Sequence, residues 1–165
     1  MVRDSQGRRH RLPRYFYEIP SWEVARETVL APGFGLYEFI HVDLYEARAL
    51  HHFPRYVPCA ITLLAAHLAV VRHDVDTYVH IAANGGYRSP SHAHTTPDTL
   101  DHACGLAADL YRVGDDFLDT PETLADYAAR IEALLPGTRT LPADATRDHL
   151  HLSLGYGTLV PPYLP

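Results

Sequence analysis

The sequence predicts an α+β fold in which a small antiparallel sheet has helices packed against it. Helical segments come first along the chain, followed by a strand, a long loop, a second strand, a helix and a last strand, an order typical of this class. The 165 residues are 47% hydrophobic, which is enough for one domain with its own core. We expect a single domain over 1–165, with an N-terminal arm and helices in 1–55 and the motif-bearing core in 56–160.

The N-terminal third is expected to hold an extended arm and two short helices. Residues 1–20 are mixed in character and contain two prolines. A helix should begin at Ser21, with an acidic residue early in its first turn, and end before the Pro-Gly pair at 32–33. A second helix is expected at about 43–51, and prolines then bracket a loop over 54–58.

The middle of the chain predicts a helix followed by a strand. A helix is expected from Cys59 to Arg72, because four apolar residues fall on one helical face: Ile61, Leu64, Leu68 and Val71. The segment TYVHIAA, residues 77–83, is typical of a strand, and Asn-Gly-Gly after it indicates a turn. The long loop over 87–103 is rich in Ser, Pro, Thr and His, and long loops in compact domains are often functional.

The last third predicts two strands with a helix between them. The first strand runs from Leu106 to Val113. Thr120 can cap the helix and Pro121 suits its first position, while the Pro-Gly pair at 136–137 ends it. A loop is expected over 138–147, and DHLHLSLG, residues 148–155, is typical of the final strand.

Composition excludes several partners. The net charge is −6 and all 14 basic residues are arginines, which argues against nucleic acid or an anionic membrane surface as partner. No apolar run approaches the roughly 18 residues of a membrane span, and the charged N-terminus is not followed by the apolar stretch of a secretory signal. Cys59 and Cys104 form no C-x-x-C pair, so we expect free thiols and no thiolate metal site. The oligomeric state stays open.

The histidines of the last strand indicate where chemistry could lie. Alternate residues of a strand face the same way, so His149 and His151 lie opposite the leucines between them. In the strand before the helix, Asp109 lies on the face opposite Leu110, and His102 precedes that strand. If the two strands are neighbours, two imidazoles and one carboxylate can converge, which is a common catalytic zinc set. The alternative is that these histidines are simply exposed and Asp109 caps a loop.

Three motifs in this region together resemble one family. HACGLAAD, from His102 to Asp109, fits the H-x-x-G-x-A-x-D pattern of the zinc D-Ala-D-Ala carboxypeptidase-type metallopeptidases. Their fold is shared with Van-type dipeptidases, L-Ala-D-Glu endolysins and the hedgehog signalling domain. GGYRSPSH, residues 85–92, looks like the G-Y-R-S segment of the group, and DHLH, residues 148–151, looks like its closing histidine motif. The motifs cover roughly residues 77–154 in the expected order.

The resemblance implies a Zn²⁺ site and the fold of the hedgehog and D-Ala-D-Ala peptidase group. By position in the motifs, His102, Asp109 and His151 would be the metal ligands, and His149 would support the site or face the substrate. Asp148 stands three residues before the last ligand, where the family has a Glu general base. Asp144, in the preceding loop, is a competing candidate for the base.

Further implications concern the substrate. Arg88 would donate to the scissile carbonyl oxygen or to a substrate carboxylate. A planar, charged guanidinium suits either role. Tyr87 and Ser89 flank it and would also contact the substrate. His92 and His94 are interpreted as solvated loop residues, the alternatives being that they line the cleft or bind an incidental second metal.

The function implied is hydrolysis of peptide bonds next to D-amino acids, such as those of peptidoglycan stem peptides. Carboxypeptidase, dipeptidase and endopeptidase stay open. One alternative is a non-catalytic zinc-binding interaction domain of the same fold, and another is a metal-free structural domain. The expected location is the cytoplasm, or outside the cell if the chain is released as an endolysin.

Overall fold

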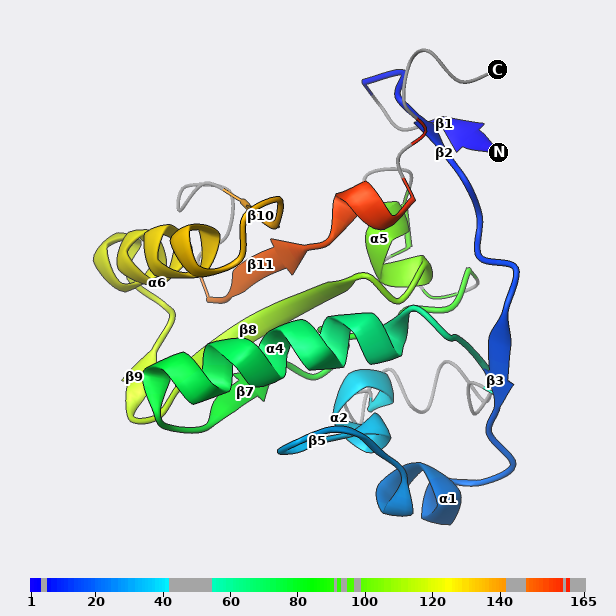
Figure 1. The fold of residues 1–165 in the computed structure, drawn as a ribbon, viewed down its shortest axis with the longest axis horizontal. Helices are drawn as coiled ribbons and strands as arrows, with labels where there is room; N and C mark the ends of the chain where they lie inside the picture. Colours follow the sequence, from blue (N-terminus) through cyan, green and yellow to red (C-terminus); the bar gives the residue numbers. More distant parts are fainter. Residues whose placement is uncertain are drawn as a thin grey trace.

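The computed structural model describes residues 1–3, 6–41, 55–90, 92, 95–96, 99–141, 148–158 and 160. Over these residues the chain combines antiparallel sheets with helices (Figure 1). The predicted α+β class is therefore confirmed. The helix expected at about 43–51 lies outside the described residues.

The largest sheet has five strands and includes the three expected ones. Its order is β10–β11–β8–β7, β9 pairs with β8, and all its pairs are antiparallel. The strands are β7 (Val79–Ile81), β8 (Ala107–Val113), β9 (Asp116–Phe117), β10 (Arg139–Thr140) and β11 (Leu150–Ser153). The strand β10 lies where a loop was expected, since a two-residue edge strand has too few positions to show an alternating pattern.

Three two-stranded sheets occupy the N-terminal part of the described chain. They pair β1 (Val2–Arg3) with β2 (Arg9–His10), β3 (Phe16–Glu18) with β6 (Tyr56–Pro58), and β4 (Val29–Ala31) with β5 (Phe34–Gly35). The loop predicted over 54–58 is wrong for Tyr56–Pro58. Proline is tolerated at the end of an edge strand, where its missing N–H costs no internal ladder bond.

The helices begin where the capping residues predict. The amide of Val24 donates to Ser21 Oγ at 3.3 Å at the start of α1 (Trp22–Glu27). The amide of Thr123 donates to Thr120 Oγ1 at 3.2 Å at the start of α6 (Pro121–Leu134). The predicted helix after Cys59 is α4 (Ile61–Val75). Two short helices, α2 (Leu36–Ile40) and α5 (Leu100–Ala103), were not expected, and a 3₁₀ helix spans Gly155–Gly157.

The core lies between the main sheet and its helices. The long helix α4 contacts β7 and β8, and α6 contacts β10 and β11 (Figure 1). The leucines of β11 and the one that follows this strand are at most 1% exposed, as strand parity predicts: Leu150, Leu152 and Leu154. Their burial fixes the opposite face of β11, which carries His151.

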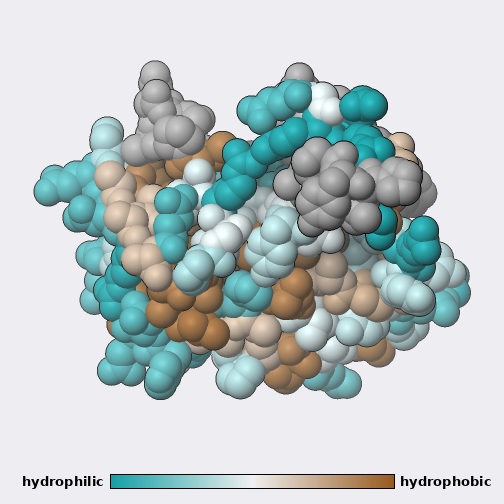
Figure 2. Space-filling model, turned by 45° about the horizontal axis from the view of Figure 1, so that its top comes forward, coloured by the Kyte–Doolittle hydropathy of each residue, from teal (hydrophilic) through white to brown (hydrophobic). Residues whose placement is uncertain are grey.

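The surface has the mixed character of a globular protein. In Figure 2, hydrophobic residues on the face shown form small groups separated by hydrophilic ones, which is ordinary for such a surface. Within the described part of the chain, no helix combines the length and apolarity needed to cross a bilayer. Both cysteines are free, as expected.

Candidate metal centre

The register of two central strands brings the first two expected ligands together. β11 pairs with β8 so that His151 lies directly opposite Asp109. Facing residues of an antiparallel pair have side chains within contact distance. His151 Nδ1 lies 2.8 Å from Asp109 Oδ1. The two strands are thus neighbours. The predicted convergence of His151 and Asp109 depended on this pairing.

The third expected ligand reaches the same place from α5. Gly105, with φ of +70°, turns the chain from this helix into β8, and glycine adopts such a φ without strain. His102 is 1% exposed, and its Nδ1–H donates to the Gly86 carbonyl at 2.8 Å. Its Nε2 lies 3.2 Å from His151 Nδ1 and 3.4 Å from Asp109 Oδ1. Because Nδ1 donates, Nε2 of the neutral ring presents a lone pair to this group.

These three atoms have a spacing that suits one metal ion. His102 Nε2, Asp109 Oδ1 and His151 Nδ1 are separated by 2.8–3.4 Å. Bonds of about 2.1 Å at tetrahedral angles would separate zinc ligands by about 3.4 Å. Two imidazoles with one carboxylate are also a known catalytic zinc donor set, which leaves the fourth position open. The residues present therefore fit the expected ion.

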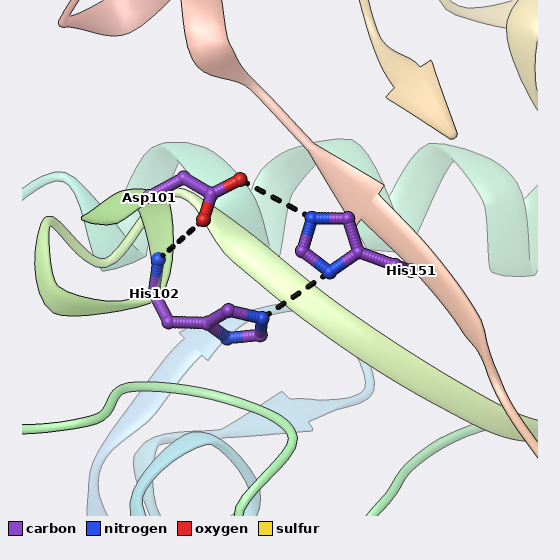
Figure 3. A group of neighbouring side chains, drawn as sticks. All are labelled: Asp101, His102 and His151. Carbon is purple, nitrogen blue, oxygen red and sulfur yellow. Dashed lines mark hydrogen bonds and ion pairs between the residues drawn. The ribbon is translucent and has the colours of Figure 1, made fainter. Parts of the chain in front are cut away.

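A fourth side chain, Asp101, joins the group. Its Oδ2 lies 3.2 Å from His151 Nε2, and its Oδ1 accepts the backbone N–H of His102 at 3.0 Å (Figure 3). One ligand atom from each of Asp101, His102 and His151 lies within 4.8 Å of the others. Two donor sets therefore share the histidines, one with Asp109 and one with Asp101. Asp101 is not among the residues that the sequence predicts for the site, although a carboxylate next to an expected ligand is a usable signal.

Both carboxylates of the group keep their negative charge, which a metal ion would balance after displacing a proton from His151. Burial raises the pKa of Asp109, but hydrogen bonds with His102 and His151 outweigh it and hold the pKa far below its usual range. In Asp101 burial likewise opposes ionisation, and the hydrogen bond with His151 brings the pKa down to about 2. Burial disfavours the His151 cation, yet hydrogen bonds to Asp101 and Asp109 raise its pKa to about 9. Two ionised carboxylates thus face each other across one imidazole.

Arg88 lies behind Asp109. Its terminal Nη2–H donates to Asp109 Oδ2, and its Nε–H donates to the Asn84 carbonyl at 2.6 Å. The Arg88 side chain is only 12% exposed. A paired guanidinium offsets the cost of keeping Asp109 ionised in the interior. The contact expected between Arg88 and a substrate stays a prediction. The contact between Arg88 and Asp109 was not predicted from the sequence.

His149 and Asp148 lie at the open side of the group. His149 Nδ1 lies 2.7 Å from Asp148 Oδ1, and His149 Nε2 lies 3.8 Å from Asp109 Oδ1. Their side chains are 29% and 84% exposed, so both face solvent more than the histidines behind them. The competing base, Asp144, lies outside the described residues.

Other expected residues lie away from this group. Tyr87 is 8% exposed and packs in the core, and the Ser89 carbonyl accepts from Thr95 Oγ1 at 2.7 Å. His92 is buried, with 5% exposure, so its interpretation as a solvated residue is wrong: the loop folds back through the His92 amide, which donates to the Ser89 carbonyl at 2.9 Å. His94 lies outside the described residues. Cys104 is buried, which raises the pKa of its thiol to about 11.

A cleft of about 1060 Å³ opens over the group. Its lining includes Asp101, His102, Asp109 and His151 together with Asp148 and His149. Residues of the N-terminal arm, of β10 and of the C-terminal segment also line it: Arg8, His10, Arg139, Thr140, Tyr156 and Thr158. The carboxylates and imidazoles therefore lie in the wall of a cleft large enough for a small ligand.

Comparisons of the chain with protein-family models, curated proteins and solved structures give no match.

Proposed function

We propose that this protein is a zinc-dependent peptidase that hydrolyses peptide bonds next to D-amino acids, such as those of peptidoglycan stem peptides. The observation that carries the proposal is the convergence of His102 Nε2, Asp109 Oδ1 and His151 Nδ1 at a cleft. Support comes from the resemblance of three motifs to D-Ala-D-Ala carboxypeptidase-type enzymes. The same resemblance leads us to propose the fold of that group for this sheet and its helices.

In this proposal the three converging side chains hold the ion. A bound Zn²⁺ would supply Lewis acidity toward a peptide carbonyl and lower the pKa of a coordinated water. Arg88 holds the Asp109 carboxylate in place through its own contact with Oδ2. The Gly86 carbonyl fixes the ring of His102 through its Nδ1–H. Such contacts behind the ligands commonly strengthen metal sites.

Proton transfer is assigned to Asp148 with His149 beside it. The exposed carboxylate of Asp148 lines the cleft and contacts the His149 ring at 2.7 Å. A carboxylate there would take a proton from the attacking water and return it to the leaving amine. Asp148 has a shorter side chain than the Glu of the family, and it lies just before β11, outside the strand ladder.

The test is hydrolysis of a stem peptide ending in D-Ala-D-Ala by the zinc-loaded protein, with and without a chelator. A matched peptide ending in L-Ala-L-Ala is the control for the D-residue. We expect cleavage of the D-peptide alone, loss of cleavage with chelator, and recovery on adding zinc. The His102→Ala protein should lose both metal and activity. Full hydrolysis by a His102→Ala protein that holds no metal would contradict the mechanism.

A second candidate, a non-catalytic zinc-binding interaction domain, is favoured by one observation. Arg88 directs its Nε and Nη2 donors to Asn84 and Asp109, which leaves fewer of its N–H groups for a substrate carbonyl. Stoichiometric zinc binding with no cleavage of stem peptides of either chirality would favour this candidate over the peptidase.

A further inference from the structure

We infer that Asp101 is a positioning residue that holds the His151 ring with its Nδ1 lone pair directed at the metal. The inference rests on the proposed zinc site and deepens it. Asp101 stands next to His102 in the sequence, and its carboxylate contacts both histidines of the group. Its role would be to fix which nitrogen of His151 is the ligand.

The carboxylate of Asp101 is anchored on one side before it meets the His151 ring. Its Oδ1 accepts the His102 amide at 3.0 Å, and its backbone carbonyl accepts the Leu106 amide at 2.9 Å. Ser153, two residues after His151 on β11, also hydrogen-bonds to the Asp101 side chain. The Asp101 side chain is 19% exposed. Asp101 therefore links α5 to β11, because its carboxylate contacts His102 on the helix and His151 on the strand.

The need for such a residue follows from the protons of His151. A neutral imidazole has one N–H donor and one lone pair. A zinc-bound His151 must be neutral, because its ligand nitrogen carries no proton. Asp109 Oδ1, 2.8 Å from Nδ1, and Asp101 Oδ2, 3.2 Å from Nε2, are then the two possible acceptors for the single proton that the ring keeps. If Nδ1 kept the proton, it would donate to the oxygen that is also the expected ligand atom of Asp109. Asp101, by accepting Nε2–H, leaves Nδ1 available.

The alternative is that Asp101 is itself a ligand, together with His102 and His151. In that arrangement His151 would bind through Nε2, and Nδ1–H would donate to Asp109. Two observations favour the positioning role. His102 Nε2 lies 3.2 Å from His151 Nδ1 and 3.4 Å from Asp109 Oδ1, so the atoms already cluster on the Nδ1 side. Asp101 Oδ1 is already used by the His102 amide.

The first experiment measures zinc affinity by chelator competition in the full-length protein. Asp101→Asn should keep one zinc per chain but bind it about 10–100-fold more weakly, the usual effect of losing a residue that orients a histidine ligand. Asp109→Asn should lose the site. Asp126→Asn, an exposed carboxylate on α6, is the matched control and should bind zinc like the wild type. Equal affinity in the Asp101→Asn and wild-type proteins would overturn the inference.

The second experiment requires no variant and therefore does not depend on whether Asp101→Asn folds. Nitrogen-15 NMR of the His151 ring in the zinc-loaded wild type should show a proton on Nε2 and none on Nδ1. A proton on Nδ1 would overturn the inference in favour of Asp101 as ligand. No zinc binding by the wild type would overturn the inference and the proposed function together. Zinc binding with the expected tautomer but no hydrolysis would overturn the proposed peptidase alone.

Discussion

His151 lies opposite Asp109 across the β8–β11 pair, with His151 Nδ1 2.8 Å from Asp109 Oδ1. The two residues are held by backbone pairing, and on the other face of β11 the leucines beside His151 are fully buried. A one-residue slip of either strand would move its whole apolar set to the wrong face. The hydrophobic core therefore fixes the relative position of His151 and Asp109, the two residues that we propose as metal ligands.

Metal removal is expected to lower the stability of the protein. A ligand that binds only the folded state at about 1,000 times its Kd stabilises it by about 4 kcal/mol. For a domain of this size that corresponds to a rise in Tm of about 8–16 °C. Calorimetry of the wild type with zinc and with excess chelator measures the difference. The His102→Ala protein is the control, and its Tm should not respond to zinc; an equal response of both proteins would place the zinc elsewhere.

Replacement of Asp148 by Asn should remove activity and leave the metal in place. Its side chain is 84% exposed and its contact is with His149, so the fold and the expected ligands should be unaffected. Loss of a general base typically costs about 10²–10⁴-fold in rate. We expect kcat on the stem peptide to fall by at least about 100-fold, with one zinc still bound. Asp119→Asn, another exposed carboxylate, should keep the wild-type rate. A wild-type rate for Asp148→Asn would show that the base is another residue.

Replacement of Arg88 by Met should destabilise the metal-free protein strongly. Removing one partner of a buried ion pair leaves Asp109 without its counter-charge and typically costs about 3–5 kcal/mol. Because the ion would supply positive charge at the same carboxylate, zinc should recover part of this loss. Denaturant unfolding with and without zinc measures both effects. The matched control is Arg130→Met, which breaks an exposed pair with Asp74 and should cost under about 1 kcal/mol. Equal losses in the two variants would contradict the role given to Arg88.

Much of the fold could be predicted because its long elements have clear local signals. Thr120 and Ser21 start helices by capping, and four apolar residues at helical spacing define α4. The short strands β6, β9 and β10 could not be predicted, since two or three residues show no period and are stabilised by a partner distant in sequence. The same limit applied to α2 and α5.

Strand parity was enough to predict which face of its strand each site residue occupies. Parity places His151 and Asp109 on defined faces, but only the β8–β11 register brings them together. Asp101 was missed because its contact with His151 depends on α5, a four-residue helix without a sequence signal. The partner of Arg88 was missed for a similar reason. A guanidinium in a loop can reach several acceptors, and the sequence does not show which one lies nearby.

Replacement of Gly86 by Ala tests how the GGYRS segment supports the centre. A Cβ at this position would overlap the backbone carbonyl of Phe39, so the segment must shift. The Gly86 carbonyl accepts the His102 Nδ1–H at 2.8 Å, and the shift should therefore turn the His102 ring away from the other ligands. We expect zinc affinity, measured by chelator competition, to fall by about 10–100-fold, as it does when a contact behind a ligand is lost.

The control for Gly86 is Gly35→Ala. Gly35 has an ordinary φ of −92°, and the nearest atom to an added Cβ is at 3.6 Å, so the methyl group fits there. This variant should bind zinc like the wild type. If Gly86→Ala also bound zinc at wild-type affinity while remaining folded, the ring of His102 would not depend on the Gly86 carbonyl. The GGYRS segment would then contribute to the fold alone, through packing against Phe39, rather than to the geometry of the metal centre.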